Sequence, residues 1–128
     1  MPIRILIVDD ETSLLLAISD YLTSHGFVCE CASEAAEAVA LLAHVPFDVV
    51  LTDVYLSPVP QADGFAVLTF VRERGLSSRV VVMTAHDTQQ VMAEAERLAA
   101  DLFLLKPVPL PKLAETLRTL ASTTGAPL

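Results

Sequence analysis

Residues 5–11 read ILIVDDE, a run of four aliphatic side chains that passes directly into three acids. Four such residues in succession predict a strand buried on both faces, as in the middle of a parallel sheet. Asp9 and Asp10 then mark the carboxyl end of that strand. Two carboxylates about 5 Å apart repel each other by roughly 3 kcal/mol at an effective dielectric constant near 20. Acids in this position must therefore either bind protons or hold a cation.

Four more apolar runs with the length of a strand follow the first. They are FVCEC at 27–31, DVVLTD at 48–53, RVVVMT at 79–84 and LFLL at 102–105, and the first run extends to IRILIV at 3–8. The run at 27–31 contains Glu30 and alternates in polarity, as an edge strand does. Segments with the period of a helix separate all five runs. This alternation predicts an α/β fold, a flavodoxin-like, doubly wound (βα)5 domain with a five-stranded parallel sheet of order 2-1-3-4-5 and helices on both faces.

The helical segments carry start signals that the chain can use as caps. Ser33 is a candidate N-cap for the second helix, and Asp87 with Gln90 resembles a capping box for the fourth. Pro111 suits the first position of the last helix. The third helix is expected from about residue 65 to 75. The first two helices present the apolar faces Leu14, Ile18, Tyr21 and Leu22, and Ala35, Ala38, Val39 and Leu42.

Length and composition limit the classes of protein to which the chain can belong. Its 128 residues suit one domain, which we place at residues 1–121, with 122–128 as a tail or the start of a linker. With 53% hydrophobic residues, disorder is not expected, and no apolar run is long enough to span a membrane. The net charge of −8 argues against direct binding to nucleic acid. Since no secretion signal opens the chain, we expect a cytoplasmic protein.

Cys29 and Cys31 are the only cysteines. Two residues apart on a strand, they share one face, and they are expected to be small buried hydrophobes in a reducing compartment. Two thiols without further Cys or His ligands make a poor zinc site.

Polar residues gather at the carboxyl ends of four predicted strands. In the predicted strand order, Asp9, Asp10 and Asp53 meet at the central switch point of the sheet, where ligands of such folds bind. Hard carboxylate ligands suit Mg²⁺ or Mn²⁺. Thr84 and Lys106 end the next two strands, and a hydroxyl, an ammonium and a metal together suit a phosphoryl group, which a carboxylate can accept. Taken singly, each residue could be a helix cap, a loop acid or a surface lysine.

These residues resemble the receiver domain of response regulators in two-component signalling, and the resemblance covers essentially the whole chain. The matching motifs are VDDE after the first strand, LTD closing the third, MTA closing the fourth and LKP after the fifth. The resemblance implies that Asp53 takes a phosphoryl group from a histidine kinase or a histidine phosphotransfer protein. It further implies that Asp10 binds Mg²⁺ directly, Asp9 through water, and Tyr55 through its backbone carbonyl.

The resemblance also implies a switch. Lys106 would pair with the phosphoryl oxygens and Thr84 would hydrogen-bond to them, while Phe103 would rotate inward. This would alter the face made by the helix containing residues 91–99, the strand at 102–105 and the last helix, to which an output domain or a partner protein would bind. The resemblance is also compatible with a weak homodimer. The chain would be a phosphoacceptor that catalyses its own modification, not a turnover enzyme.

Three further features concern the loops around the site. By resemblance, the bond between Lys106 and Pro107 is expected to be cis. By the same resemblance, Tyr55 and His86 occupy positions that would modulate the access of water to the phosphoryl group. The segment Asp63–Gly64 arrives about three residues later than is usual in the family, so the loop at 56–63 departs from its pattern.

Three other classes of protein are less consistent with these residues. A haloacid-dehalogenase-type enzyme would need an acid two residues after Asp53, where Tyr55 stands. A flavodoxin-like electron carrier would need a phosphate-binding loop after the first strand, where DDETS begins with acids. A receiver fold that signals without phosphorylation usually lacks one of the site residues, and this chain has them all.

Overall fold

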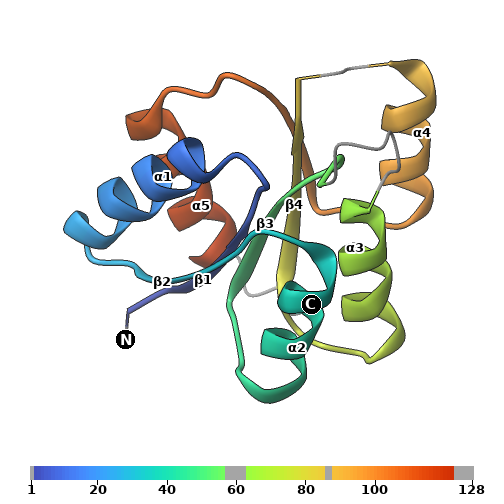
Figure 1. The fold of residues 1–128 in the computed structure, drawn as a ribbon, viewed down its shortest axis with the longest axis horizontal. Helices are drawn as coiled ribbons and strands as arrows, with labels where there is room; N and C mark the ends of the chain where they lie inside the picture. The colour runs from blue at the N-terminus through green and yellow to red at the C-terminus, as the bar shows by residue number, and fades with distance from the viewer. Residues whose placement is uncertain (1, 57–62, 86–87, 123–128) are drawn as a thin grey trace.

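The computed structural model describes residues 2–56, 63–85 and 88–122. Within these ranges five strands and five helices alternate along the chain (Figure 1). The strands are β1 (Arg4–Val8), β2 (Val28–Ala32), β3 (Val49–Asp53), β4 (Arg79–Thr84) and β5 (Leu102–Leu105). The helices are α1 (Thr12–Ser24), α2 (Ala35–His44), α3 (Gly64–Glu73), α4 (Gln89–Arg97) and α5 (Leu110–Ser122). The strands pair in parallel in the order β2-β1-β3-β4-β5, which confirms the predicted fold class and strand order.

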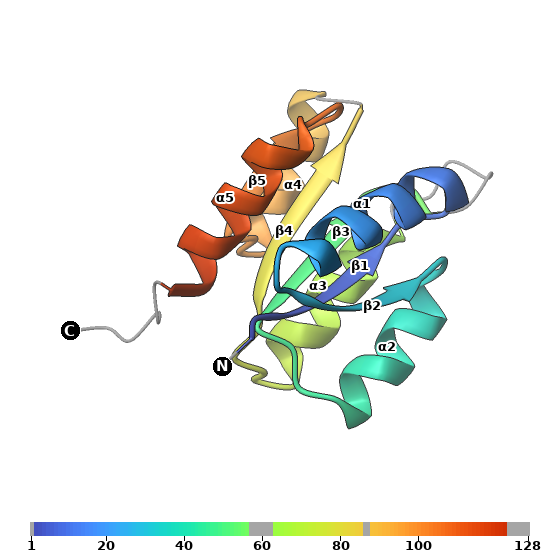
Figure 2. The same cartoon turned by 90° about the vertical axis from the view of Figure 1, so that its left-hand side faces the viewer.

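Helices cover both faces of the sheet, with α1 and α5 on one side and α2, α3 and α4 on the other (Figures 1 and 2). The alternating side chains of β1 serve both cores. Ile5 and Ile7 pack under α1 and α5, whereas Leu6 and Val8 pack under the other three helices. All four are buried, and each contributes about 1.5–3 kcal/mol by leaving water. The aliphatic run therefore forms a central strand because both of its faces are covered.

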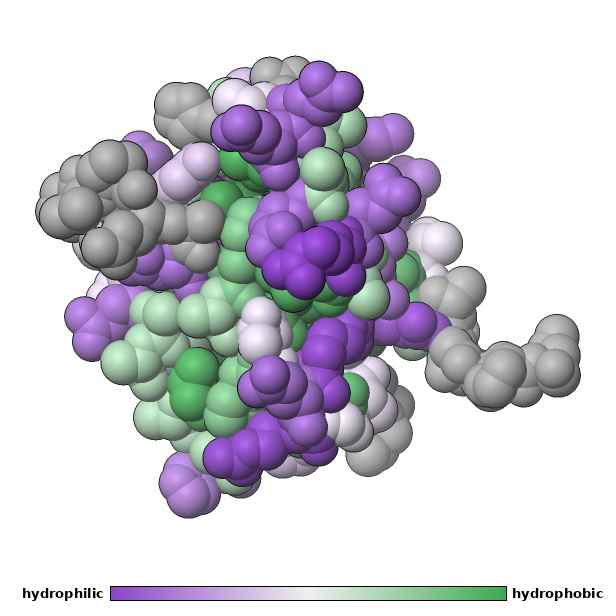
Figure 3. Space-filling model, turned by 90° about the vertical axis from the view of Figure 1, so that its right-hand side faces the viewer, coloured by the Kyte–Doolittle hydropathy of each residue, from purple (hydrophilic) through white to green (hydrophobic). Residues whose placement is uncertain are grey.

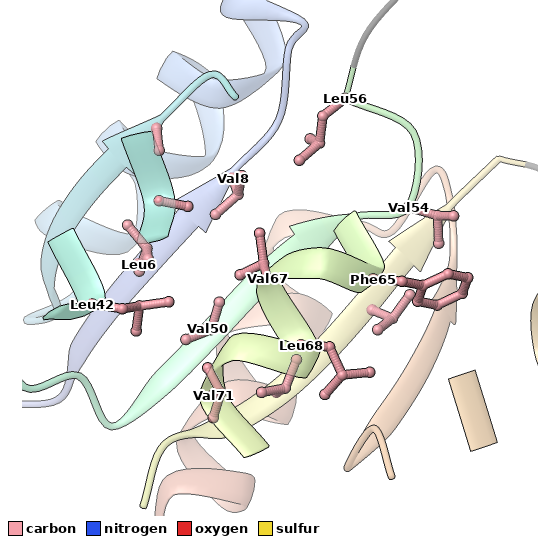
Figure 4. Packing of buried hydrophobic residues seen from close by; sticks show 14 of the residues in the cluster. Leu6, Val8, Leu42, Val50, Val54, Leu56, Phe65, Val67, Leu68 and Val71 are labelled. Carbon is pink, nitrogen blue, oxygen red and sulfur yellow. The ribbon is translucent and has the colours of Figure 1, made fainter. Parts of the chain in front are cut away.

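The core on the second face depends strongly on α3. Figure 4 shows Val67, Leu68 and Val71 of α3 packed with Val50 of β3. The three α3 side chains are fully buried. Phe65 lies on the first turn of the same helix, close to Val54 (Figure 4). Since Val54 directly follows β3, this packing fixes the chain on both sides of the loop after β3.

Helix α1 differs in detail from the predicted pattern. Its buried residues are Leu15, Ile18 and Leu22, and Leu14 is only half-buried. Gly26 ends the helix with a φ of +94°, as expected for a C-terminal glycine cap. Helix α5 begins at Leu110, one residue before Pro111.

The prediction that Ser33 caps α2 is wrong. The N-cap residue is Glu34, in extended conformation, and no side chain caps this helix. The Ser33 amide instead donates to the carboxylate of Glu37 at 2.9 Å. The carboxylate of Glu37, inside the helix, thus accepts a hydrogen bond from the amide of Ser33, which precedes the helix. A serine cap would work the other way, with the serine hydroxyl accepting from an amide inside the helix.

The N-cap of α4 is Thr88, whose hydroxyl accepts a hydrogen bond from the Val91 amide at 3.1 Å. Asp87, the predicted cap, lies outside the described residues. A threonine at this position satisfies one of the free amides of the first turn, so the capping chemistry is present one residue later.

The outer surface over α3 and α4 is mixed in polarity. Figure 3 shows hydrophilic side chains gathered near the centre and top of this face and apolar ones toward its lower left. Among the described helices, none is both long and apolar enough to cross a membrane.

Helix α4 ends in a left-handed residue that is not glycine. Ala99 has a φ of +65°, and its amide donates to the Glu96 carbonyl while the Ala100 amide donates to the Ala95 carbonyl. This is the hydrogen-bond pattern of a Schellman cap, in which the left-handed residue is usually glycine.

We expect Ala99→Gly to raise the free energy of unfolding by about 0.5–1 kcal/mol, because relief of left-handed strain exceeds the extra chain entropy of glycine. Denaturant unfolding of the variant measures this change. Ala93→Gly, in the exposed middle of α4, is the control and should lower the same free energy by about 0.5–1 kcal/mol. Destabilisation by both variants would contradict the assignment of strain to residue 99.

Candidate functional site

The carboxyl ends of four strands meet at one edge of the sheet. Asp9 and Asp10 follow β1, Asp53 closes β3, Thr84 closes β4 and Lys106 follows β5. Because these strands are parallel, their carboxyl ends lie side by side. One carboxylate oxygen from each of Asp9, Asp10 and Asp53 lies within 4.8 Å of the other two. The structure therefore brings the three predicted acids together.

Lys106 joins two of these acids. Its ammonium Nζ donates to Asp9 Oδ2 and to Asp53 Oδ2, each at 2.7 Å. Asp9 is fully buried and Asp53 is only 8% exposed, whereas Asp10 faces solvent. A buried carboxylate is tolerated only when it is paired and hydrogen-bonded, so the lysine compensates both buried acids.

Burial and pairing act on the acid–base properties of the site in opposite directions. Burial raises the pKa of the Asp53 carboxyl, and the nearby charge of Asp9 adds to this, while the bond to Lys106 only partly offsets them. For Lys106, burial alone would lower the pKa, but the hydrogen bonds to Asp53 and Asp9 outweigh it and raise the pKa above its ordinary value. The ammonium therefore stays charged, and Asp53 is the carboxylate whose ionised form is less favoured than usual.

Backbone amides hold the other oxygens of the paired acids. The Glu11 amide donates to Asp9 Oδ1 at 2.9 Å, and the Tyr55 amide lies 3.4 Å from Asp53 Oδ1. The buried hydroxyl of Thr52 donates to the Asp53 backbone carbonyl at 3.0 Å. Both carboxylates are thus oriented by one ammonium and one amide each, which limits their rotation.

Thr84 and Phe103 lie on β4 and β5, which continue the sheet beyond β3. Thr84 is fully buried, and its carbonyl accepts the Lys106 amide at 2.9 Å. The peptide bond between Lys106 and Pro107 is cis. Phe103 is half-buried on β5 and packs against the core beneath α2, α3 and α4. His86 lies outside the described residues, as does most of the late loop at 56–63.

Gly64 is a site residue that sequence reasoning did not assign. It is buried at the start of α3, and its amide donates to the Val54 carbonyl at 2.8 Å. A Cβ atom built on Gly64 would lie 1.8 Å from the backbone oxygen of Asp53. Only glycine therefore allows α3 to approach Asp53 this closely. The dipeptide Asp63–Gly64 marks this position in the sequence, but only the fold shows that the glycine faces the backbone of Asp53.

A cleft of about 390 Å³ opens beside Lys106, between α1 and the start of α5. Its polar residues are Glu11 and Lys106, and the rest of its lining is mainly apolar. The lining residues include Leu14, Ile18, Met83, Pro107, Val108, Leu110 and Leu113. Lys106 therefore belongs to both the cleft and the site, whereas Asp9, Asp10 and Asp53 do not line the cleft.

The donor set of the site fits a divalent metal ion. Three carboxylates and one ammonium leave two formal negative charges, which a divalent cation would neutralise. Carboxylate, carbonyl and water oxygens are the ligands that Mg²⁺ prefers, and it commonly keeps several waters. Exposure of Asp10 on the open side leaves room for such waters.

Comparison with known proteins agrees with this geometry. A family model described as a response regulator receiver domain matches residues 5–118. Response regulator MprA of Mycobacterium sp. (strain KMS) is 32% identical over 125 residues, which are 98% of this chain and 53% of that protein. Transcriptional regulatory protein TrcR of Mycobacterium tuberculosis is 34% identical over 119 residues, which are 93% of this chain and 45% of that protein. The chain thus spans about half the length of these relatives.

Solved structures support the same grouping. A response regulator receiver domain protein (CheY-like) from Methanospirillum hungatei JF-1 superposes with a TM-score of 0.88 at 25% sequence identity, and the match covers 97% of both chains.

Proposed function

Because the chain belongs to the response regulator receiver domain family, we propose that Asp53 accepts a phosphoryl group from a phosphohistidine. The donor would be a histidine kinase or a histidine phosphotransfer protein. The observation that carries this proposal is the Lys106 ammonium, which bridges Asp9 and Asp53 at 2.7 Å beside a third carboxylate. The domain would not be a turnover enzyme, because it is its own substrate.

Asp10 and Asp53 would hold Mg²⁺ or Mn²⁺ directly, Asp9 through water, and Tyr55 through its backbone carbonyl. The bound metal supplies positive charge to the oxygens of the transferring phosphoryl group. The chain itself contributes orientation, since the Tyr55 amide and Lys106 each contact one oxygen of the Asp53 carboxylate. Pre-set geometry of this kind is the main protein contribution to phosphoryl transfer.

In the transfer, a carboxylate oxygen of Asp53 forms a bond to phosphorus while the phosphorus–nitrogen bond to the donor imidazole breaks. Lys106 would exchange its bond to Asp53 for one to a phosphoryl oxygen, and the Thr84 hydroxyl would donate to another. Attack of water on the same phosphorus would later release phosphate and restore the carboxylate. By resemblance to the family, Tyr55 and His86 would modulate that attack, and the bulky Tyr55 would slow it.

We place the output of this modification on the face formed by α4, β5 and α5. Movement of Thr84 toward the phosphoryl group would leave space for Phe103, which is half-buried, to turn inward. Met92 of α4 and Leu105 of β5 are apolar side chains on these elements that are 49% and 47% exposed, which supports a surface for an output domain, a partner protein or a second copy. The cytoplasm is the proposed location.

Residues 1–121 would form the receiver domain, and residues 122–128 a tail or the start of a linker. Helix α5 includes Ser122, and residues 123–128 lie outside the described residues.

Incubation with a small acyl phosphate, such as acetyl phosphate, together with Mg²⁺ tests the proposal. Intact mass should show one added phosphoryl group per chain, and chelation of the metal should prevent the addition. An unchanged mass with both reagents present, in a folded protein, would overturn the proposed function.

We also expect Mg²⁺ affinity to depend on pH through Asp53. A protonated carboxyl cannot bind the metal, and burial raises the pKa of Asp53 above its ordinary value. As the pH falls through that raised pKa, Mg²⁺ affinity should decrease, starting above the pH of about 4 at which an ordinary Asp titrates. Calorimetric titrations with Mg²⁺ from pH 7 down to about pH 4 measure the trend, and Asp53→Asn should remove this part of it. A constant affinity across the range would contradict the role of Asp53 as a ligand.

A further inference from the structure

Arg72 connects three parts of the chain at the edge of the sheet opposite the site. It lies in the last turn of α3, and its Nε and Nη2 both donate to the Ala99 carbonyl, at 3.1 and 2.7 Å. Nη1 donates to the Ser78 carbonyl at 3.3 Å, and Nη2 also contacts Asp101 Oδ2 at 2.7 Å. The planar guanidinium thus binds the end of α4, the start of β4 and the start of β5 at once.

Asp101 extends these contacts along the sheet. The Val80 amide donates to Asp101 Oδ2 at 2.7 Å, and the Asp101 amide donates back to the Val80 carbonyl at 2.8 Å. Arg79 adds a longer ion pair to Asp101 Oδ1 at 3.3 Å. Asp101 is only 18% exposed at its side chain, so these bonds are partly shielded from water. The amino-terminal end of β5 is therefore bound to β4 by side chain and backbone together.

Helix α4, in contrast, has little apolar packing of its own. Only Val91 and Ala95 of its nine residues are buried. Thr88 and the first helical residues are exposed, and so is Met92. Two hydrogen bonds from Arg72 of α3 reach the carbonyl of Ala99, two residues past the end of α4. The hydrogen bonds from α3 thus lie just past the carboxyl end of α4, whereas in its amino-terminal half Val91 is the one buried side chain.

We infer that Arg72 is a positioning residue that anchors the carboxyl end of α4 to α3 and makes Ala99 the pivot of that helix. α3 and α4 lie on the same side of the sheet (Figure 1). α3 is a rigid support because three of its side chains are fully buried in the core. The anchor itself is independent of phosphorylation. The consequence that α4 swings about Ala99 when Asp53 is modified rests on the proposed function.

An arginine is required for this role by geometry. The guanidinium offers five N–H donors in a fixed plane and uses them on two carbonyls and one carboxylate. A lysine at position 72 could keep the ion pair with Asp101, but its single ammonium could not bind Ala99 through two donors and Ser78 through a third. Arg72→Lys therefore removes the hydrogen bonds to Ala99 and Ser78 while it keeps the ion pair with Asp101.

Hydrogen–deuterium exchange of the unmodified protein tests the anchor. In Arg72→Lys and Arg72→Met, the amides of residues 98–100 should exchange roughly tenfold faster or more, because charge-assisted hydrogen bonds that close this end of α4 are lost. Amides of β1 and β3 should change much less. Arg97→Met is the matched control, since Arg97 lies on α4 with an exposed ion pair to Glu94, and it should leave residues 98–100 protected. Unchanged exchange at residues 98–100, or equal acceleration throughout the domain, would overturn the anchor.

The swing is tested by repeating the measurement with acetyl phosphate and Mg²⁺. In the wild type, exchange should change at residues 90–92 and stay constant at 98–100, whereas in Arg72→Met both ends should change. A change at both ends of α4 in the wild type would overturn the pivot. If intact mass shows no phosphoryl group, the proposed function fails, and the exchange of the unmodified variants still decides whether Arg72 is the anchor.

Discussion

Asp53→Asn is expected to abolish phosphorylation of the domain while leaving it folded. The amide oxygen of asparagine is too weak a nucleophile to form an acyl phosphate, whereas the amide keeps nearly the same shape in a position that is only 8% exposed. Intact mass after incubation with acetyl phosphate and Mg²⁺ should therefore show one added phosphoryl group on the wild type and none on the variant.

The Asp53→Asn variant should still fold, and the reason is the direction in which the pKa of Asp53 is shifted. The folded-state pKa of Asp53 is raised mainly by burial, so ionisation of this carboxyl is less favourable in the folded domain than in the unfolded chain. At pH values above the unfolded pKa, the charge on Asp53 therefore costs stability, and a neutral amide relieves that cost. The raised pKa already includes the opposing effect of the Lys106 ion pair, and in the variant Asp9 still pairs with the lysine.

The matched control is Asp20→Asn, the same change in chemistry at an exposed position of α1. It should be phosphorylated like the wild type. A phosphoryl group on folded Asp53→Asn, located by peptide mass on another acid, would show that residue 53 is not the acceptor.

The arrangement of the strands was predictable because it depends on side-chain polarity along single segments. The run at residues 79–84 was predicted with the bounds that β4 has, and the strand order placed Asp9 and Asp53 at one edge. A strand end is a local property, and parallel pairing then brings distant strand ends together without further information. This explains why the acids and Lys106 could be identified before their distances were known.

Features that depend on contacts between elements were not predictable in the same way. The N-cap residue of α2 is Glu34 and not Ser33, because the Ser33 amide bonds to Glu37 inside the helix, and the sequence alone does not favour that contact over a serine cap. The contact of Arg72 with Ala99 joins residues 27 positions apart and depends on how α3 and α4 are placed. A positive φ at Ala99 has no sequence signal either, since alanine is an ordinary helix former.

Gly64→Ala is expected to reduce both stability and phosphorylation, because the added methyl group would overlap the backbone of the acceptor residue. The new Cβ would lie 1.8 Å from the Asp53 oxygen and 2.9 Å from the Val54 Cα, and neither atom belongs to a flexible side chain. Overpacking of this kind costs about 1–3 kcal/mol or more, which lowers Tm by roughly 5–15 °C. Differential scanning calorimetry measures the shift.

Gly75→Ala is the control, because it replaces a glycine with alanine without creating any overlap. Gly75 has a φ of +63° but open space where a Cβ would stand, so alanine there costs only the left-handed strain of about 1–2 kcal/mol. Gly64 has no such positive φ, and any cost at residue 64 therefore comes from contact. If Gly64→Ala is as stable as the wild type, the close approach of α3 to Asp53 is not as tight as the geometry indicates.

The effect on phosphorylation follows from where the overlap occurs. Relief of the contact requires α3 or the Asp53 carbonyl to move, and that carbonyl is also held by the Thr52 hydroxyl at 3.0 Å. A shift of the backbone would move the carboxylate away from Lys106, to which it is bonded at 2.7 Å. At temperatures where both variants are fully folded, Gly64→Ala should therefore accept phosphoryl groups from acetyl phosphate more slowly and bind Mg²⁺ more weakly, whereas Gly75→Ala should match the wild type. Equal slowing in both variants would mean that lost stability, not displacement of Asp53, causes the defect.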